Sequence, residues 1–126
     1  MRLAGLLLLC LVSLTAAAPA PAPAAAKDRG PVAVGVAARE FSLSPYRDSV
    51  RPGPVRFNLT NFGEDGHDLV VTAPGGKVVG RLDEVAGFGG RGTLEVSLRR
   101  TGTYSLLCTI ADHSSRGMRA KLRVRR

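Results

Sequence analysis

Strict alternation of apolar and polar residues is the feature that most constrains how this chain of 126 residues can fold. The segment nearest the C-terminus shows it most clearly. There, one parity is apolar and the other is basic: Met118, Ala120, Leu122 and Val124 against Arg119, Lys121, Arg123 and Arg125. Successive side chains of a strand point to opposite faces, whereas a helix needs a period near 3.6. We therefore expect a strand with one buried face, and with Met118 facing inward where that strand begins.

The same parity recurs in five earlier segments. Their inward-facing sets are Val32, Val34 and Val36; Val55, Phe57, Leu59 and Asn61; His67, Leu69 and Val71; Leu94, Val96 and Leu98; and Tyr104, Leu106 and Cys108. Turn sequences such as RPGP, APGG and GFGG separate them, and long helical periodicity is missing. Short strands between such turns are typical of two packed sheets. The sequence predicts an all-β fold, a Greek-key antiparallel β-sandwich of about seven or eight strands.

The N-terminal residues have the organisation of a secretory signal. Arg2 precedes an apolar run over residues 3–14, which is followed by small residues and prolines. That run is too short for a membrane span, which needs about 20 residues. We predict cleavage near Ala26, so that residues 1–26, including Cys10, form the signal peptide and residues 27–126 form one domain. The mature protein is expected to be exported, periplasmic or extracellular, without a transmembrane segment.

Net charge narrows the choice of partner. Without Arg2, 17 basic residues stand against 10 acidic ones, a formal charge of +7 for the predicted mature chain. Export argues against nucleic acid as the partner. Acidic protein surfaces or anionic membranes are the expected counterparts, with a highly charged, solvated surface as the alternative interpretation.

Soft and imidazole side chains are scarce, yet they gather in one segment. Apart from Met1 and Cys10, the chain has one cysteine, one methionine and two histidines, and three of these four lie within CTIADHSSRGM, residues 108–118. A single cysteine cannot form an internal disulfide, so Cys108 is a reactive thiol, an inert core residue or a metal ligand. The spacing Cys108, His113, Met118, together with His67 after the turn-rich NFGEDG, favours a metal. A thiolate and two imidazoles in a plane, with a weak axial thioether, form the ligand set of electron-transfer copper sites.

Other interpretations of these residues remain open at this point. Each of the four alone is more often an ordinary core or surface residue. Zinc binds cysteine and histidine but rarely methionine. A Cys–His nucleophile pair, oriented by Asp68 or Asp112, would make the chain a hydrolase, although no oxyanion loop is recognisable. The GFGGRG segment fits a dinucleotide-binding pattern, but a strand pattern follows it instead of a helix.

The quoted motifs match a known family. NFGEDGHDLVV followed by GTYSLLCTIADHSSRGM resembles the blue copper proteins, the cupredoxins related to plastocyanin, azurin and pseudoazurin, over most of residues 32–124. The resemblance implies a cupredoxin-like sandwich in which His67, Cys108, His113 and Met118 bind one type 1 copper ion. It also implies that Met118 is the axial ligand and that His113 is the port for electrons at the surface.

Two positions depart from the family pattern. Asp68 stands where many members have asparagine, and its carboxylate could accept hydrogen bonds from the Thr109 hydroxyl or backbone. Its negative charge beside copper would stabilise Cu(II) and lower the reduction potential. Ala111 and Asp112 replace the Pro-Gly often seen in the ligand loop, so the resemblance does not extend to the rigidity of this loop.

These expectations add up to a monomeric electron carrier, not an enzyme, that cycles between Cu(II) and Cu(I). Its expected partners are redox proteins with acidic docking surfaces. Phe62 and Phe88 lie in segments where an apolar docking patch around His113 could form. The main alternative is a copper-binding module for sequestration or delivery.

Overall fold

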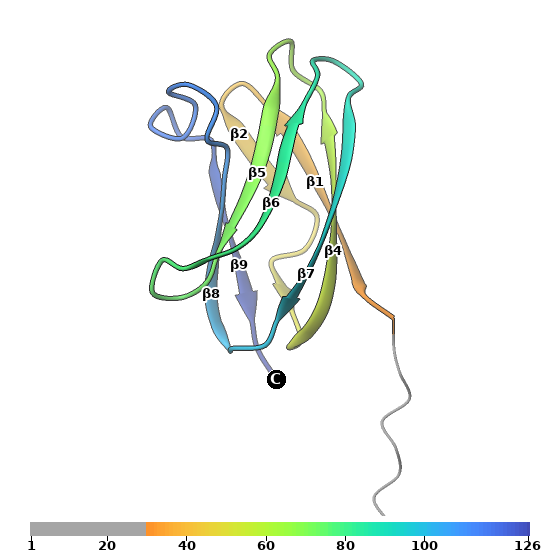
Figure 1. The fold of residues 1–126 in the computed structure, drawn as a ribbon, viewed down its shortest axis with the longest axis vertical. Helices are drawn as coiled ribbons and strands as arrows, with labels where there is room; N and C mark the ends of the chain where they lie inside the picture. The colour runs from red at the N-terminus through yellow and green to blue at the C-terminus, as the bar shows by residue number, and fades with distance from the viewer. Residues whose placement is uncertain (1–29) are drawn as a thin grey trace, which may run out of the picture.

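Nine strands in two facing sheets make up the part of the chain that the computed structural model describes, residues 30–126 (Figure 1). The predicted signal peptide, residues 1–26, lies outside the described residues. The strands are β1 (Val32–Arg39), β2 (Ser42–Pro45), β3 (Ser49–Val50), β4 (Gly53–Asn61), β5 (His67–Thr72), β6 (Val78–Val85), β7 (Arg91–Leu98), β8 (Gly102–Leu107) and β9 (Arg119–Val124). Within residues 30–126, no helix is long and apolar enough to cross a bilayer.

The strands form a four-stranded sheet in the order β2-β1-β4-β7 and a five-stranded sheet in the order β3-β9-β8-β5-β6. The predicted β-sandwich is confirmed, but two details of the prediction were wrong. The sheets are mixed, because β1 pairs with β4 and β3 pairs with β9 in parallel. Alternation reveals which side of a strand is buried, but not the direction of its neighbour. Strands β2 and β3, with four and two residues, are too short to show alternation, so the strand count was low.

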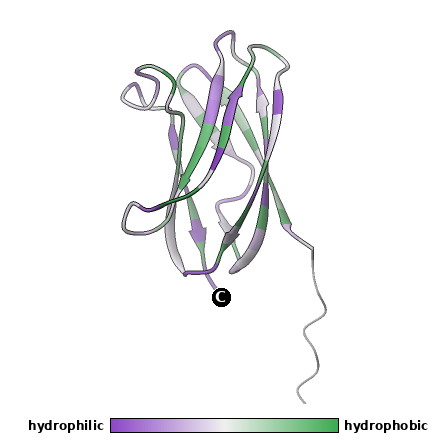
Figure 2. Ribbon diagram, in the orientation of Figure 1, coloured by the Kyte–Doolittle hydropathy of each residue, from purple (hydrophilic) through white to green (hydrophobic). Residues whose placement is uncertain are grey.

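The hydrophobic core lies between the two sheets. More buried and less buried positions alternate along β1, β4, β7 and β9. The hydropathy colouring shows both apolar and polar stretches on the strands (Figure 2). Every second residue of β4 from Val55 to Asn61 is buried, and Leu122 and Val124 are the buried positions of β9. Burying a side chain such as leucine stabilises the fold by about 2 kcal/mol. The predicted parity of these strands is therefore confirmed.

The connections between strands lie at two opposite ends of the sandwich. The connections β4–β5, β6–β7 and β8–β9 lie at one end, which is uppermost in Figure 1. The β7–β8 connection and the C-terminus lie at the opposite end. We call these the upper end and the lower end. Residues that begin β5 or β9, or that end β8, therefore meet at the upper end.

Candidate metal centre

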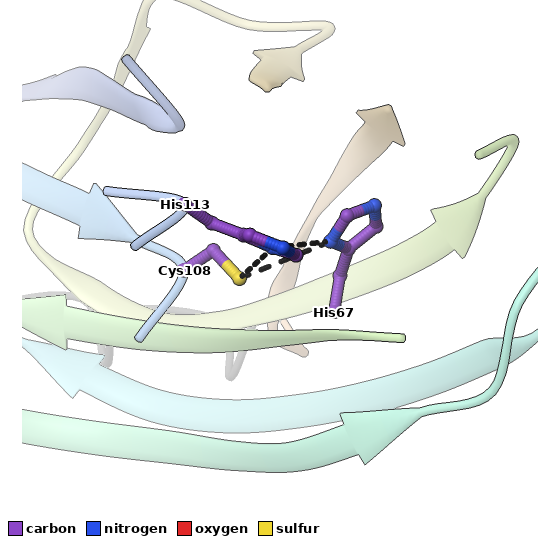
Figure 3. Close-up of side chains that lie close together, drawn as sticks. All are labelled: His67, Cys108 and His113. Atoms are coloured by element: carbon purple, nitrogen blue, oxygen red, sulfur yellow. Dashed lines mark hydrogen bonds between the residues drawn. The ribbon is translucent and has the colours of Figure 1, made fainter. Parts of the chain in front are cut away.

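Three side chains with metal-binding atoms converge at the upper end. His67 is the first residue of β5, Cys108 directly follows β8, and His113 lies in the β8–β9 connection. One donor atom from each residue lies within 4.8 Å of the other two, and all three residues are buried. Figure 3 shows the thiol and both imidazole rings turned toward a common point. The structure thus brings together three of the four predicted ligands.

The spacing of the three atoms suits a single ion. The Nδ1 atoms of His67 and His113 are 3.3 Å apart, and the Cys108 Sγ lies 3.9 Å and 3.6 Å from them, respectively. A circle through three points with these separations has a radius of about 2.1 Å, close to the metal–nitrogen distances of about 2.0–2.1 Å in protein zinc sites. One thiolate sulfur and two imidazole nitrogens form a donor set that suits copper in both oxidation states, and also zinc.

Met118, the fourth predicted ligand, is held beside this cluster by its backbone. Its carbonyl accepts a hydrogen bond from the Cys108 amide at 3.1 Å, and its own amide donates to the His113 carbonyl at 2.9 Å. The residue is fully buried. Gly117, with φ of 110°, makes the turn that leads into it, in a conformation that favours glycine. The ligand loop, residues 108–118, is therefore closed on itself at both ends.

Asn61 organises the segment that delivers His67, a role that the sequence analysis missed. Its amide nitrogen donates to the carbonyls of Asp65 at 2.6 Å and Ala86 at 2.9 Å, and its amide oxygen accepts the Gly63 N–H at 2.8 Å. The side chain is fully buried, and these bonds satisfy its polar atoms. The signal was present in the sequence, because Asn61 is a polar residue on an otherwise apolar, inward-facing parity.

Glu40 contacts the outer side of His67. Its Oε1 accepts the Asp65 N–H at 2.8 Å and lies 3.3 Å from the His67 Nε2, although without the alignment of a hydrogen bond. The hydrogen bond from Asp65 is the main cause that lowers the pKa of Glu40, which keeps this group a carboxylate. Burial lowers the pKa of His67, so the neutral imidazole is favoured. A neutral imidazole is the form that binds metals.

Burial also raises the pKa of the Cys108 thiol. A buried, protonated thiol is a poor nucleophile, because the thiolate is the reactive form. A metal cation in the same place would reverse this preference, since a coordinating thiol loses its proton. The surroundings of Cys108 thus favour metal binding over nucleophilic catalysis.

His113 is the one member of the cluster with some contact with the surface. It is 5% exposed, whereas His67 and Cys108 are 0% exposed. Its ring meets the Phe41 ring edge-on, with centroids 5.2 Å apart, and its Nε2 lies 3.7 Å from the carboxylate of Asp65. The guanidinium of Arg116 covers Phe41 at 3.5 Å from the ring centroid. His113 is therefore shielded on its sides and reaches the surface through a small opening.

Asp68 ties the first histidine to the ligand loop. This nearly buried carboxylate accepts both the backbone N–H and the hydroxyl of Thr109, each at 2.5 Å, as the sequence analysis anticipated. The unanticipated partner is Arg81, whose Nη1 donates to the Asp68 Oδ2 and to the Thr109 Oγ1, both at 3.2 Å. The negative charge beside the site is therefore paired with a positive one.

Comparison with known proteins identifies the fold of this chain. No family model matches the sequence, and no curated protein matches it. Among solved structures, dithionite-reduced auracyanin from the photosynthetic bacterium Roseiflexus castenholzii is 18% identical, with a TM-score of 0.66 over 75% of this chain and 98% of that one. Auracyanin A, a blue copper protein from the green thermophilic photosynthetic bacterium Chloroflexus aurantiacus, is 17% identical, with a TM-score of 0.64 over 76% and 100%. The chain has the cupredoxin fold.

The cupredoxin fold is not limited to small carriers. A copper-containing nitrite reductase from Thermus scotoductus matches with a TM-score of 0.57 and 18% identity, over 77% of this chain and 32% of that one. Within the cupredoxin fold of this chain, the buried thiol and the two imidazoles occupy the upper end of the sandwich. The expectation of a cupredoxin-like β-sandwich is thus confirmed, and the choice between carrier and enzyme depends on the site itself.

Proposed function

We propose that residues 27–126 form an exported, periplasmic or extracellular cupredoxin that binds one type 1 copper ion and shuttles single electrons between redox proteins. The observation that carries the proposal is the buried convergence of the His67 and His113 Nδ1 atoms with the Cys108 sulfur. In this proposal those three residues would hold the ion, and Met118 would add its thioether as a weak fourth ligand. The bound copper would supply a one-electron Cu(II)/Cu(I) couple.

The protein contributes position and shielding. The closed ligand loop fixes Cys108 and His113 relative to each other, and Asn61 fixes the segment before His67. Burial of all three residues excludes water from the site. A site that is already assembled changes little between two oxidation states, which favours fast electron transfer through the slightly exposed His113.

The counts of side chains favour a carrier over an enzyme. Both histidines of this chain belong to the cluster, so no further histidine remains for a second copper centre. The raised pKa and full burial of Cys108 disfavour the hydrolase alternative. We therefore propose outer-sphere electron transfer, in which no substrate bond is made or broken.

Docking at the upper end would use apolar contacts. Phe62 and Phe88 are 38% and 80% exposed, and the hydrogen bonds of Asn61 with Gly89 and Gly90 bring their two loops together. We propose that redox partners with acidic docking surfaces make a small, short-lived contact there, where Arg39 lies over Phe62 and Arg116 lies over Phe41. Electron-transfer complexes bury little surface, so we expect the partner to bind weakly. We propose that the protein itself is a monomer.

The decisive test of this function is spectroscopic. We expect the purified protein, loaded with Cu(II), to show an intense visible thiolate-to-copper band and the electron spin resonance signal of a type 1 site. Cys108→Ser should abolish the band, whereas Met118→Leu should keep it and shift the reduction potential, because the axial ligand tunes that potential. A colourless protein that retains stoichiometric zinc would contradict the proposal.

Copper sequestration or delivery could use the same ligands, and a kinetic measurement separates the two roles. An electron carrier should exchange electrons rapidly between its oxidised and reduced forms. Slow self-exchange combined with very tight Cu(I) retention would instead favour sequestration. Both quantities can be measured on one copper-loaded preparation.

A further inference from the structure

Two adjoining hollows at the lower end of the sandwich are lined by arginines. The first, of about 540 Å³, is lined by Arg47, Arg51, Arg125 and Arg126 together with glycine, serine and small apolar residues, among them Val32, Val50, Pro52 and Pro54. The second, of about 430 Å³, is lined by Arg99, Arg100 and Arg126 and shares Pro52 with the first. We call these six arginines the arginine pole. All six side chains are exposed, and among residues 30–126 none of those that line the two hollows is acidic.

The charge of the arginine pole is not neutralised by nearby carboxylates. The arginines that form ion pairs within residues 30–126 are Arg56, Arg81 and Arg123, none of which belongs to the pole. Asp48 lies close to the pole, but Arg123 binds it at 2.6 Å. Six like charges at one end of a small domain therefore outnumber the carboxylate side chain close to them, Asp48, which Arg123 binds and which also interacts with Arg125.

The upper end has a different character. Carboxylates and arginines are mixed there: Asp65 lies beside His113, Asp68 is paired with Arg81, and Arg39 covers the Phe62 ring at 4.8 Å from its centroid. Arg39, Arg91, Arg116 and Arg119 at the upper end also form no ion pair within residues 30–126. They stand among carboxylates, Glu40, Glu64, Asp65 and Asp112, whereas the arginine pole at the opposite end lacks this mixture (Figure 1). A partner bound at the arginine pole would leave the upper end free.

The guanidinium groups of the arginine pole indicate which kind of partner it binds. Protein interfaces usually have an apolar core with few charges, but none of the exposed large apolar side chains lines the two hollows. Guanidinium groups bind phosphate oxygens through paired hydrogen bonds. Groups of four to eight basic residues are typical of surfaces that bind anionic phospholipids. An array of phosphates matches an arginine-rich end better than an apolar protein groove does.

We propose that the arginine pole docks on an anionic phospholipid surface and holds the metal end away from the membrane. This interaction requires no copper, so it can be tested on metal-free protein and its outcome is independent of the proposed electron transfer. The probe is vesicle binding at low salt, with pure phosphatidylcholine compared with an equimolar mixture of phosphatidylcholine and phosphatidylglycerol. The protein is used in the form isolated from the producing cell.

Two charge-matched triple variants separate the pole from net charge alone. The pole variant is Arg51→Gln, Arg125→Gln and Arg126→Gln. The control variant is Arg56→Gln, Arg91→Gln and Lys121→Gln, three exposed positions outside both hollows. Each basic residue at an anionic membrane contributes about 1 kcal/mol, so the pole variant should bind the mixed vesicles roughly 100-fold more weakly. The control variant should lose much less, and salt should weaken binding by the native protein.

The orientation of the vesicle-bound protein can be measured separately by hydrogen exchange. On mixed vesicles, hydrogen exchange should slow at the lower-end segments 51–54 and 99–102, and should not change at the upper-end segments 62–66 and 86–90. The proposal is overturned by equal losses in both triple variants, by equal binding to pure phosphatidylcholine, or by protection at the upper end. Binding of inorganic pyrophosphate or of polyglutamate without binding to mixed vesicles would also overturn it, in favour of a free anion or an acidic protein.

Discussion

At the scale of single residues, the charge beside the metal centre differs from what the sequence suggested. Asp68 alone would lower the reduction potential of a copper ion by stabilising Cu(II). Arg81, 13 residues later, places its guanidinium 3.2 Å from that carboxylate. Since the two charges largely cancel at a distance, we expect Asp68 to act mainly through its hydrogen bonds to Thr109.

A pair of substitutions tests this compensation on the copper-loaded protein. Arg81→Met leaves a lone negative charge and should lower the reduction potential, whereas Asp68→Asn leaves a lone positive charge and should raise it. Each shift should be on the order of tens of millivolts for a partly screened charge near the ion. The double variant should return close to the native potential, as measured by redox titration.

Arg56→Met is the matched control, because Arg56 pairs with Glu95 across β4 and β7, strands of the other sheet. It should leave the potential unchanged. If Arg81→Met leaves the potential where it was, Arg81 does not compensate the charge of Asp68.

The residues of the candidate metal centre could be singled out from the sequence, but several of the residues that support them could not. His67, Cys108, His113 and Met118 stood out because such side chains are scarce in this chain. Glu40 and Arg81 act through contacts with residues far along the chain, and nothing in their local sequence marks those contacts. Chemistry that depends on one rare residue type is visible in a single sequence, whereas a pairing between two common ones is not.

At the scale of elements, the two sheets contribute differently to the site. The five-stranded sheet carries the cluster, through the start of β5 and the ends of β8 and β9 that face it. The four-stranded sheet supplies the supports: Asn61 at the end of β4, and Glu40 and Phe41 between β1 and β2. Alternation predicted the buried faces of β4, β8 and β9 correctly. It could not predict the parallel pairing of β1 with β4, because strand direction depends on how the chain crosses between sheets.

The turn before Met118 offers a prediction about the ligand loop. Gly117→Ala introduces a side chain at φ of 110°, and the nearest atom to its Cβ would be the Phe41 carbonyl oxygen at 3.7 Å, so the cost is backbone strain and not a clash. We expect a loss of about 1–2 kcal/mol in the free energy of unfolding, together with a shifted copper absorption band. Urea unfolding and visible spectroscopy measure the two effects.

Gly76→Ala provides the comparison, since Gly76 has φ of 88° with open space around it in the β5–β6 turn at the lower end. It should cost similar stability and leave the copper spectrum unchanged. A Gly117→Ala spectrum identical to the native one would show that the ligand geometry does not depend on this turn.

At the scale of the whole molecule, the metal should act as a link between distant parts of the chain. His67 and Cys108 are separated by 41 residues, and the unfolded chain does not hold their donor atoms together. An ion that binds the folded state stabilises it, by about 2.7 kcal/mol when its free concentration is 100 times the dissociation constant. For a domain of about 100 residues this corresponds to a rise in melting temperature of roughly 10 °C or more.

Thermal unfolding with and without Cu(II) measures this linkage. Cys108→Ser should lose most of the rise, while its metal-free melting temperature should stay close to that of the native protein. An equal rise in both proteins would place the stabilising copper elsewhere on the chain.

The lengths of the strands also set the distance between the upper and lower ends of the sandwich. Strands β1, β6 and β7 have eight residues each, and a strand advances about 3.3 Å per residue, so roughly 26 Å lies between the two ends of the sandwich. That is about three Debye lengths at physiological ionic strength. Anions bound at Arg51 and Arg126 should therefore have little effect on exposed charges at the upper end. The length of the β-sandwich thus allows the charge of its lower end to be neutralised with little change in the surface potential of its upper end.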